Sequence, residues 1–213
     1  MTDAKICGLK TMATLNAALD GGADYVGLVF FAKSPRHVTL AQAAILADRA
    51  SGKVGIVALV VDPDDASIDA IVSEVAPDVF QLHGHESPDR VSAIRSRIGR
   101  PVWKAVPVAT TADAERANDY AGIADLIVFD AKAPVGAVLP GGNGHAFDWQ
   151  ALDAVKGRLR FMLSGGLNPD NVAQAIAITG ATAVDVSSGV ETSPGVKDPE
   201  LIHRFLRAVK QAR

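Results

Sequence analysis

Four short apolar segments of this chain end in polar side chains that can act as acids, bases or ligands. The polar side chains are Cys7, Gln81, His83, Asp130, Asp185 and Ser187. A thiol and a carboxyl group that face one ligand can transfer protons as base and acid. Residues two apart share a face of a strand, so Gln81 lies with His83 and Asp185 with Ser187. The pattern predicts a polar site where several strands end.

Each of these residues also has a simpler interpretation. A lone cysteine in an apolar strand is usually an inert small hydrophobe, and a lone strand histidine is usually a packed core residue. Asp130 could bond only the start of the loop that follows it. Packing alone does not predict polar groups at the ends of four strands, however, and burying them unpaired would be costly. The joint pattern therefore favours an active site.

The elements that would position these groups alternate along the chain. Apolar runs predict strands at 4–7, 24–30, 54–61, 79–83, 101–107, 126–130, 160–164 and 183–187. Helical patterns lie between them at 11–20, 40–51, 65–76, 87–98, 112–121, 148–157, 169–179 and 198–211. The strand runs are almost continuously apolar, which is typical of parallel strands covered on both faces.

Eight such units in 213 residues predict a single-domain α/β fold over 1–213, the (β/α)8 TIM barrel with eight parallel strands. In that fold, chemistry takes place at the carboxyl ends of the strands, where Cys7 stands. A doubly wound sheet is the alternative, but no GxGxxG motif follows the first run.

Helix boundaries agree with this arrangement. Thr39 can cap a helix, and Asn168-Pro169 and Asp198-Pro199 each place a capping residue before a proline at the first helical position. The connection 131–147 is rich in proline and glycine and has no periodicity. Because it leaves the carboxyl end of a strand, we expect it to be a lid over the site rather than a surface insertion.

Composition excludes several classes of function. The net charge is -3 and the basic residues are scattered, so we expect no nucleic-acid partner. No apolar run approaches the roughly 20 residues of a membrane span, and no signal peptide is evident. One cysteine cannot form an internal disulfide, which suits the reducing cytoplasm.

We expect a monomer, because no exposed apolar stripe demands a partner, and we leave a dimer open.

Two glycine-containing segments near the C-terminus could bind an anion. Gly165-Gly166 follows the seventh strand run, and Ser187-Ser188-Gly189 follows the eighth. Adjacent glycines let backbone N–H groups approach an oxyanion closely, and many barrels bind phosphate between these two loops. Arg36 could supply a guanidinium for a planar carboxylate, although an isolated arginine is more commonly solvated.

Taken together, these segments resemble the phosphoribosylanthranilate isomerase family of tryptophan biosynthesis. The matching stretches, in order, are Lys5-Ile6-Cys7-Gly8-Leu9, Ser34-Pro35-Arg36, Gln81-Leu82-His83-Gly84, Phe129-Asp130, Gly141-Gly142-Asn143-Gly144, Phe147-Asp148-Trp149, Leu163-Ser164-Gly165-Gly166-Leu167-Asn168-Pro169 and Val184-Asp185-Val186-Ser187-Ser188-Gly189-Val190-Glu191. They cover residues 5 to about 198. Asn143 departs from the family pattern, which often has threonine there.

The resemblance implies an Amadori rearrangement of N-(5-phosphoribosyl)anthranilate to 1-(2-carboxyphenylamino)-1-deoxyribulose 5-phosphate, with no metal and no cofactor. It implies that Cys7 is the general base and Asp130 the general acid. Arg36 would meet the anthranilate carboxylate, and the segments around Gly165-Gly166 and Ser187-Ser188-Gly189 would hold the phosphate. Asp185 would support the reacting end, and Gln81 and His83 would line the pocket. Lys5 would help to hold the Cys7 thiolate.

Three alternatives remain to be weighed against this interpretation. The histidine-pathway isomerase family performs the same rearrangement, but it uses an aspartate where this chain has Cys7. Epimerases of the ribulose-phosphate type need a metal site, for which the ligand spacing is unconvincing. A non-catalytic phosphosugar-binding barrel would need the phosphate segments but neither Cys7 nor Asp130.

Overall fold

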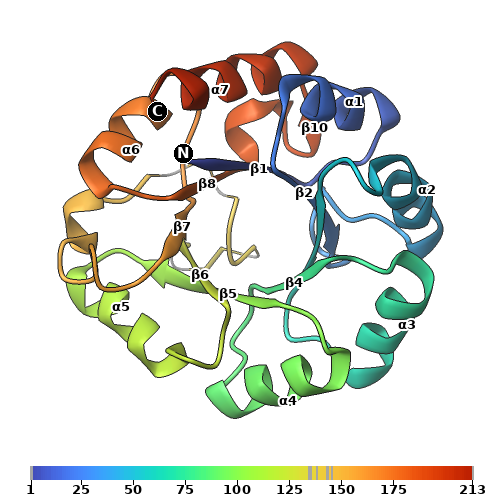
Figure 1. The fold of residues 1–213 in the computed structure, drawn as a ribbon, viewed down its shortest axis with the longest axis horizontal. Helices are drawn as coiled ribbons and strands as arrows, with labels where there is room; N and C mark the ends of the chain where they lie inside the picture. The colour runs from blue at the N-terminus through green and yellow to red at the C-terminus, as the bar shows by residue number, and fades with distance from the viewer. Residues whose placement is uncertain (1, 134–135, 138, 143, 145, 213) are drawn as a thin grey trace.

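Eight parallel strands close into a barrel in the computed structural model, which describes residues 2–133, 136–137, 139–142, 144 and 146–212 (Figure 1). The strands are β1 (Asp3–Cys7), β2 (Tyr25–Phe30), β3 (Gly55–Val60), β4 (Val79–Leu82), β5 (Val102–Val108), β6 (Leu126–Ala131), β7 (Phe161–Leu163) and β8 (Ala183–Val186). Each strand pairs with the next, and β8 returns to β1 with Asp185 opposite Lys5. The predicted TIM barrel is confirmed.

Helices form a ring around the barrel (Figure 1). The α-helices are α1 (Met12–Gly21), α2 (Leu40–Ala50), α3 (Asp65–Val75), α4 (Pro88–Ile98), α5 (Thr111–Glu115), α6 (Val172–Thr179) and α7 (Pro199–Gln211). Short 3-10 helices are η1 (Arg116–Tyr120), η2 (Trp149–Leu152) and η3 (Ser188–Val190). None of the described helices is long and apolar enough to cross a lipid bilayer.

Alternation along each strand separates two environments. Outward-facing side chains such as Ile6, Leu28 and Phe80 are almost fully buried against the helices. Burying one such side chain stabilises the fold by about 1.5–3 kcal/mol, so this layer supplies most of the stability. The inward-facing side chains at the amino ends form a second apolar cluster, in which Tyr25 and Trp103 meet edge to face at 4.9 Å. Polar residues therefore collect at the opposite, carboxyl end of the interior.

Two predicted helices are shorter than expected. The segment 112–121 forms only α5 and η1. Thr110 and Asp113 make a capping box that starts α5, but Asn118 and Asp119 follow soon after its end. Side chains of that kind compete with the helical backbone for hydrogen bonds. The segment 148–157 forms η2 and then turns, because its backbone bonds span three residues, as from the Val155 N–H to the Leu152 carbonyl.

The predicted helix starts are correct in two cases out of three. Thr39 makes a full capping box with Gln42, and the Asp198 carboxylate accepts from the N–H groups of Glu200 and Leu201. The Asn168 side chain accepts from the N–H groups of Asp170 and Asn171, but α6 begins later, at Val172. Asn168 therefore closes a turn before the helix. The hairpin of β9 (Glu191–Ser193) and β10 (Val196–Lys197) was not predicted, because it lacks apolar alternation.

A buried ion pair joins the outer face of β5 to the loop after β4. The Lys104 Nζ lies 2.9 Å from Glu86 Oε2 and donates to the Gly84 carbonyl at 2.8 Å. Glu86 Oε1 accepts from the backbone N–H groups of Asp62 and Gly84. Both side chains of the pair are at most 3% exposed. These bonds hold the loop that follows His83.

We expect Lys104→Met to destabilise the protein by about 3–5 kcal/mol, because it leaves the buried Glu86 carboxylate unpaired. Urea unfolding followed by circular dichroism would measure the change. The control is Lys132→Met, which removes an ion pair to Asp113 whose lysine is 53% exposed and should cost less than about 1 kcal/mol. Equal, small losses in both variants would contradict the importance assigned to the buried pair.

Candidate active site

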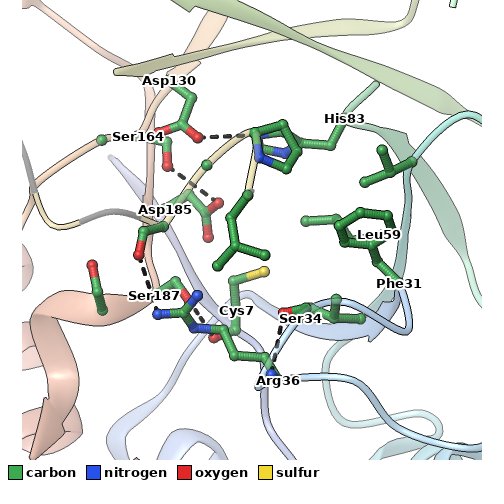
Figure 2. A pocket seen from close by; sticks show the side chains of 18 of the residues that line it. Cys7, Phe31, Ser34, Arg36, Leu59, His83, Asp130, Ser164, Asp185 and Ser187 are labelled. Atoms are coloured by element: carbon green, nitrogen blue, oxygen red, sulfur yellow. Dashed lines mark hydrogen bonds and ion pairs between the residues drawn. The ribbon is translucent and has the colours of Figure 1, made fainter. Parts of the chain in front are cut away.

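One cavity lies at the carboxyl ends of the strands, and most of the predicted site residues line it (Figure 2). The predicted residues in its lining are Cys7, Arg36, His83, Asp130, Gly165, Gly166, Asp185, Ser187 and Ser188. Two predicted residues lie elsewhere. Gln81 is completely buried beneath the cavity, and Gly189 packs against the backbone of Leu167. The expectation that Gln81 lines the pocket is therefore wrong, because its neighbours in the barrel interior cover it.

The thiol of Cys7 points into this cavity from the end of β1 (Figure 2). It lies opposite Gly27 of β2 in the barrel wall. A Cβ at position 27 would come within 2.8 Å of the sulfur, so only glycine leaves room for the thiol at this place. Cys7 is 3% exposed, and its side chain is reached through the cavity.

Burial raises the pKa of the Cys7 thiol above its ordinary value. The positive charge of Lys5 lowers this pKa, as predicted, and the negative charge of Asp185 raises it. Desolvation outweighs the effect of Lys5, so the pKa of the thiol stays above its ordinary value.

Lys5 is the centre of a buried polar layer beneath the cavity. Its ammonium group is completely buried, lies 3.0 Å from Asp185 Oδ2, and donates to Gln81 Oε1 at 2.8 Å. Burial alone would lower the pKa of Lys5, but Asp185 and Cys7 raise it above its ordinary value. The other oxygen of Asp185, Oδ1, is buried and accepts no hydrogen bond from the described residues. It is an open acceptor in a residue that lines the cavity.

Asp130 faces the cavity from the end of β6 (Figure 2). Its Oδ2 lies 3.0 Å from His83 Nε2, and its Oδ1 accepts from the Ala131 N–H at 2.9 Å. The carboxyl group is 4% exposed. The structure thus brings together Asp130 and His83, which the sequence placed only on the same rim. Figure 2 shows the carboxyl group of Asp130 and the sulfur of Cys7 on different sides of the same cavity.

Arg36 is held by the carboxylate of Glu191, to which the sequence patterns gave no role. Its Nε and Nη2 both donate to Glu191 at 2.8 Å. Lys197 donates to the same Glu191 at 2.5 Å, and the two cations overcome the effect of burial, lowering the pKa of Glu191 to about 2. Two positive charges and one negative charge give the cluster of Arg36, Lys197 and Glu191 a net charge of +1. That charge favours an anionic ligand group.

The loops after β7 and β8 lie against each other. Gly165 and Gly166 both adopt positive φ, of 85° and 65°, and a Cβ on Gly165 would meet the Ala131 backbone N at 2.3 Å. A Cβ on Gly189 would come within 1.9 Å of the Leu167 carbonyl oxygen. Only glycine fits these positions. The close approach brings the Gly165-Gly166 and Ser187-Ser188 backbones to one side of the cavity.

Part of the predicted lid lies over the cavity. Leu139, Pro140, Gly141 and Gly142 are in its lining. A Cβ on Gly141 would come within 2.2 Å of Asp130 Oδ2, so the loop backbone closely approaches the carboxyl group. Asn143, the residue that departs from the family pattern, lies outside the described residues. The loop after β6 thus contributes residues to the cavity wall, and its action as a lid stays a prediction.

Sequence reasoning missed several groups that shape the site. Ser164 lies in the lining and within 3.5 Å of Asp185, and Gly27 makes room for Cys7. Glu191 stood in a matching stretch without an assigned role, and Lys197 stood in none. The polar Ser164 after the apolar run 161–163 was a visible signal, but nothing in the sequence indicated that Lys197 would reach Ser187 and Glu191.

The model of the N-(5'phosphoribosyl)anthranilate (PRA) isomerase family matches residues 4–208. The chain is 59% identical to the N-(5'-phosphoribosyl)anthranilate isomerase of Rhodopseudomonas palustris (strain BisA53), over 98% of this chain and 95% of that protein. The chain belongs to the PRA isomerase family. The family predicted from the motifs is thus confirmed.

Solved structures agree with this assignment. The PRA isomerase from Thermotoga maritima matches with a TM-score of 0.89 and 36% identity, covering 99% of this chain and 100% of that one. A structure of PRA isomerase in complex with reduced 1-(o-carboxyphenylamino)-1-deoxyribulose 5-phosphate matches with a TM-score of 0.87 and 34% identity over 99% and 100% of the two chains. The chain is an isomerase of tryptophan biosynthesis, and the non-catalytic alternative is not supported.

We expect iodoacetamide to alkylate Cys7 slowly at pH 7, because burial raises the pKa of the thiol and only the thiolate reacts. The rate should rise with pH through an inflection above about 8.5, the value of a free thiol. Mass spectrometry of the intact protein measures the modification without ambiguity, since the chain has one cysteine. A reaction rate that is already maximal near pH 7 would contradict this description of the thiol.

Proposed function

We propose that the cavity performs the Amadori rearrangement of N-(5-phosphoribosyl)anthranilate to 1-(2-carboxyphenylamino)-1-deoxyribulose 5-phosphate, with Cys7 as general base and Asp130 as general acid. The observation that carries the proposal is that one cavity is lined by this thiol and this carboxyl group on different sides. An acid and a base that face one sugar from different directions suit an isomerisation in which one proton is added and another is removed.

The reaction begins with opening of the ribose ring. Asp130 gives its proton to the ring oxygen, the bond from that oxygen to C1 breaks, and the nitrogen lone pair forms a protonated imine at C1. The thiolate of Cys7 then removes the proton from C2, and the electron pair moves to make a C1–C2 double bond. The resulting enolamine gains a proton at C1 and loses one from the C2 hydroxyl, which yields the ketone. The substrate gains and loses equal numbers of protons, as an isomerisation requires.

Several charges support the two proton transfers. Lys5 and Lys197 both lower the pKa of Cys7 and thereby favour its thiolate. Asp185 Oδ1, which accepts no hydrogen bond from the part of the chain that the structure describes, can accept one from a substrate hydroxyl at the reacting end. We assign Asp185 to this supporting role, as expected from the sequence.

The two ends of the substrate would bind to opposite parts of the cavity. The net positive charge of the Arg36, Glu191 and Lys197 cluster supports binding of the anthranilate carboxylate, with the guanidinium edge that carries Nη1 left for the ligand. The backbones of Gly165, Gly166 and Ser188 would hold the phosphate through N–H groups. Ser187 and Gly189 would shape this part of the cavity.

Cys7→Ser and Asp130→Asn should each lower the turnover number by about 100-fold or more, because each removes a proton-transfer group. The assay follows the loss of fluorescence of the anthranilate adduct in metal-free buffer. Asp170→Asn, whose carboxylate side chain is 82% exposed, is the matched control and should keep normal turnover. Normal turnover by both site variants would remove the assigned roles, and no turnover by the unmodified protein would remove the proposed reaction.

We further propose that residues 1–213 form one domain that acts as a monomer in the cytoplasm. One apolar layer runs from Ala4 to Val209, which supports a single domain. The sole cysteine supports a reducing compartment. The exposed large apolar side chains among the described residues are Met12, Ile45 and Val196, in three different elements. A related structure from Thermotoga maritima shows monomers generated from a dimeric PRA isomerase, so a dimer is the alternative to this proposal.

Sedimentation equilibrium should give a mass close to the 22.1 kDa of one chain across a tenfold range of protein concentration. Scattered apolar side chains bury too little area to hold two copies together. A mass near twice that value at all concentrations would show that the chain forms a dimer.

A further inference from the structure

A chain of hydrogen bonds crosses the barrel from the fully buried Lys5 on β1 to Asp130 on β6, which lines the cavity. Lys5 Nζ lies 2.8 Å from Gln81 Oε1, and Gln81 Nε2 lies 3.1 Å from His83 Nδ1. His83 Nε2 lies 3.0 Å from Asp130 Oδ2. These hydrogen bonds link Lys5, two residues before Cys7, with the carboxyl group of Asp130 on the other side of the site.

The first member of the chain determines the direction of the rest. An ammonium group can only donate hydrogen bonds, so the Gln81 atom that faces Lys5 must be the carbonyl oxygen. The amide nitrogen of Gln81 therefore faces His83, and it too can only donate. His83 Nδ1 must accept this bond with its lone pair, because a hydrogen on Nδ1 would meet the amide hydrogen.

The second nitrogen of His83 follows from the first. A neutral imidazole with a lone pair on Nδ1 carries its hydrogen on Nε2. That hydrogen points at Asp130 Oδ2, which accepts it, while Oδ1 accepts from the Ala131 N–H. Each carboxyl oxygen is thus held by one donor from the protein, and the remaining direction of Oδ2 is left for the cavity.

The buried surroundings keep the chain in this state. Lys5 and Gln81 are completely buried, and the His83 side chain is 11% exposed. Asp185 also binds the Lys5 ammonium group, at 3.0 Å, and so helps to hold it in place. Water has little access to replace any of these bonds, so a reversed Gln81 amide would leave Lys5 facing an amide nitrogen at considerable cost.

We propose that Lys5 and Gln81 are positioning residues that hold His83 as the Nε2–H tautomer, and that His83 thereby orients the carboxyl group of Asp130 for proton transfer. In this arrangement His83 donates to Asp130 and does not itself touch the reacting atoms. The inference rests on the proposed role of Asp130, but the tautomer of His83 can be observed without any substrate. It also gives Lys5 a second role, because the same ammonium group lowers the pKa of Cys7.

The decisive experiment is NMR of the protein labelled with 15N at histidine, recorded at pH 8, where a neutral imidazole gives distinct shifts for its two nitrogens. The His83 signals are assigned from their loss in His83→Asn. We expect the unmodified protein to carry the His83 hydrogen on Nε2. A hydrogen on Nδ1, or a mixture of both tautomers, would overturn the proposal whatever the variants do.

Gln81→Glu tests the direction of the chain. The carboxylate can still accept from Lys5, but it also accepts from His83, so the hydrogen should appear on Nδ1. The turnover number should fall about tenfold or more while KM changes less than about threefold, because Asp130 is misoriented but the binding groups are intact. Gln174→Glu, on the exposed side of α6, makes the same chemical change and should alter neither the His83 signals nor turnover.

Two outcomes separate this inference from the proposed function. If the unmodified protein has the Nε2–H tautomer but Gln81→Glu keeps full turnover, the positioning role is wrong and the acid role of Asp130 stands. If the unmodified protein does not convert the substrate, the proposed function fails, and the tautomer measurement still decides the hydrogen-bond chain. If the Gln81→Glu variant does not fold, the His83 tautomer of the unmodified protein is still measured. A hydrogen on Nδ1 there is sufficient to reject the proposed hydrogen-bond chain.

Discussion

The buried ammonium group of Lys5 is the interaction on which the site depends. An uncompensated charge in the barrel interior would cost several kcal/mol, so Lys5 must be paired and fully hydrogen-bonded. Asp185 supplies the opposite charge and Gln81 a carbonyl oxygen. Satisfying this one group therefore orients a carboxylate on β8 and an amide on β4. Gln81 in turn contacts His83, and Asp185 lines the cavity together with Cys7.

The barrel allows this polar layer because its stability comes from elsewhere. The outward faces of the strands and the helices around them form a continuous apolar layer, whereas the amino end of the interior is filled by aromatic and aliphatic side chains. Neither cluster includes the carboxyl-end residues that line the cavity with polar atoms. The protein can thus keep a thiol, carboxylates and two lysines close together without losing the fold, which is a general property of sites built on this architecture.

Charges from distant parts of the chain complete the site at its rim. Arg36 follows β2, while Glu191 and Lys197 belong to the small hairpin after β8. Their ion pairs connect the loop after β2 to the hairpin after β8. Serine and lysine contacts continue this connection, since Lys197 also donates to Ser187, whose hydroxyl bonds the Cys7 carbonyl. The charges at the rim and the environment of the thiol are in this way physically joined.

Local patterns in the sequence determined the strands, the barrel and the identity of most residues in the cavity. Continuous apolar runs and the spacing of polar residues at their ends are properties of neighbours along the chain, and they predicted Cys7, His83, Asp130 and Asp185 at one rim. Only the tertiary structure decided how those groups interact. Three results depend on side chains far apart in sequence. Desolvation outweighs the effect of Lys5 on the pKa of Cys7, Glu191 holds Arg36, and Gln81 is completely buried. Burial and hydrogen-bond direction arise from the packing of all eight strands, so no local pattern contains them.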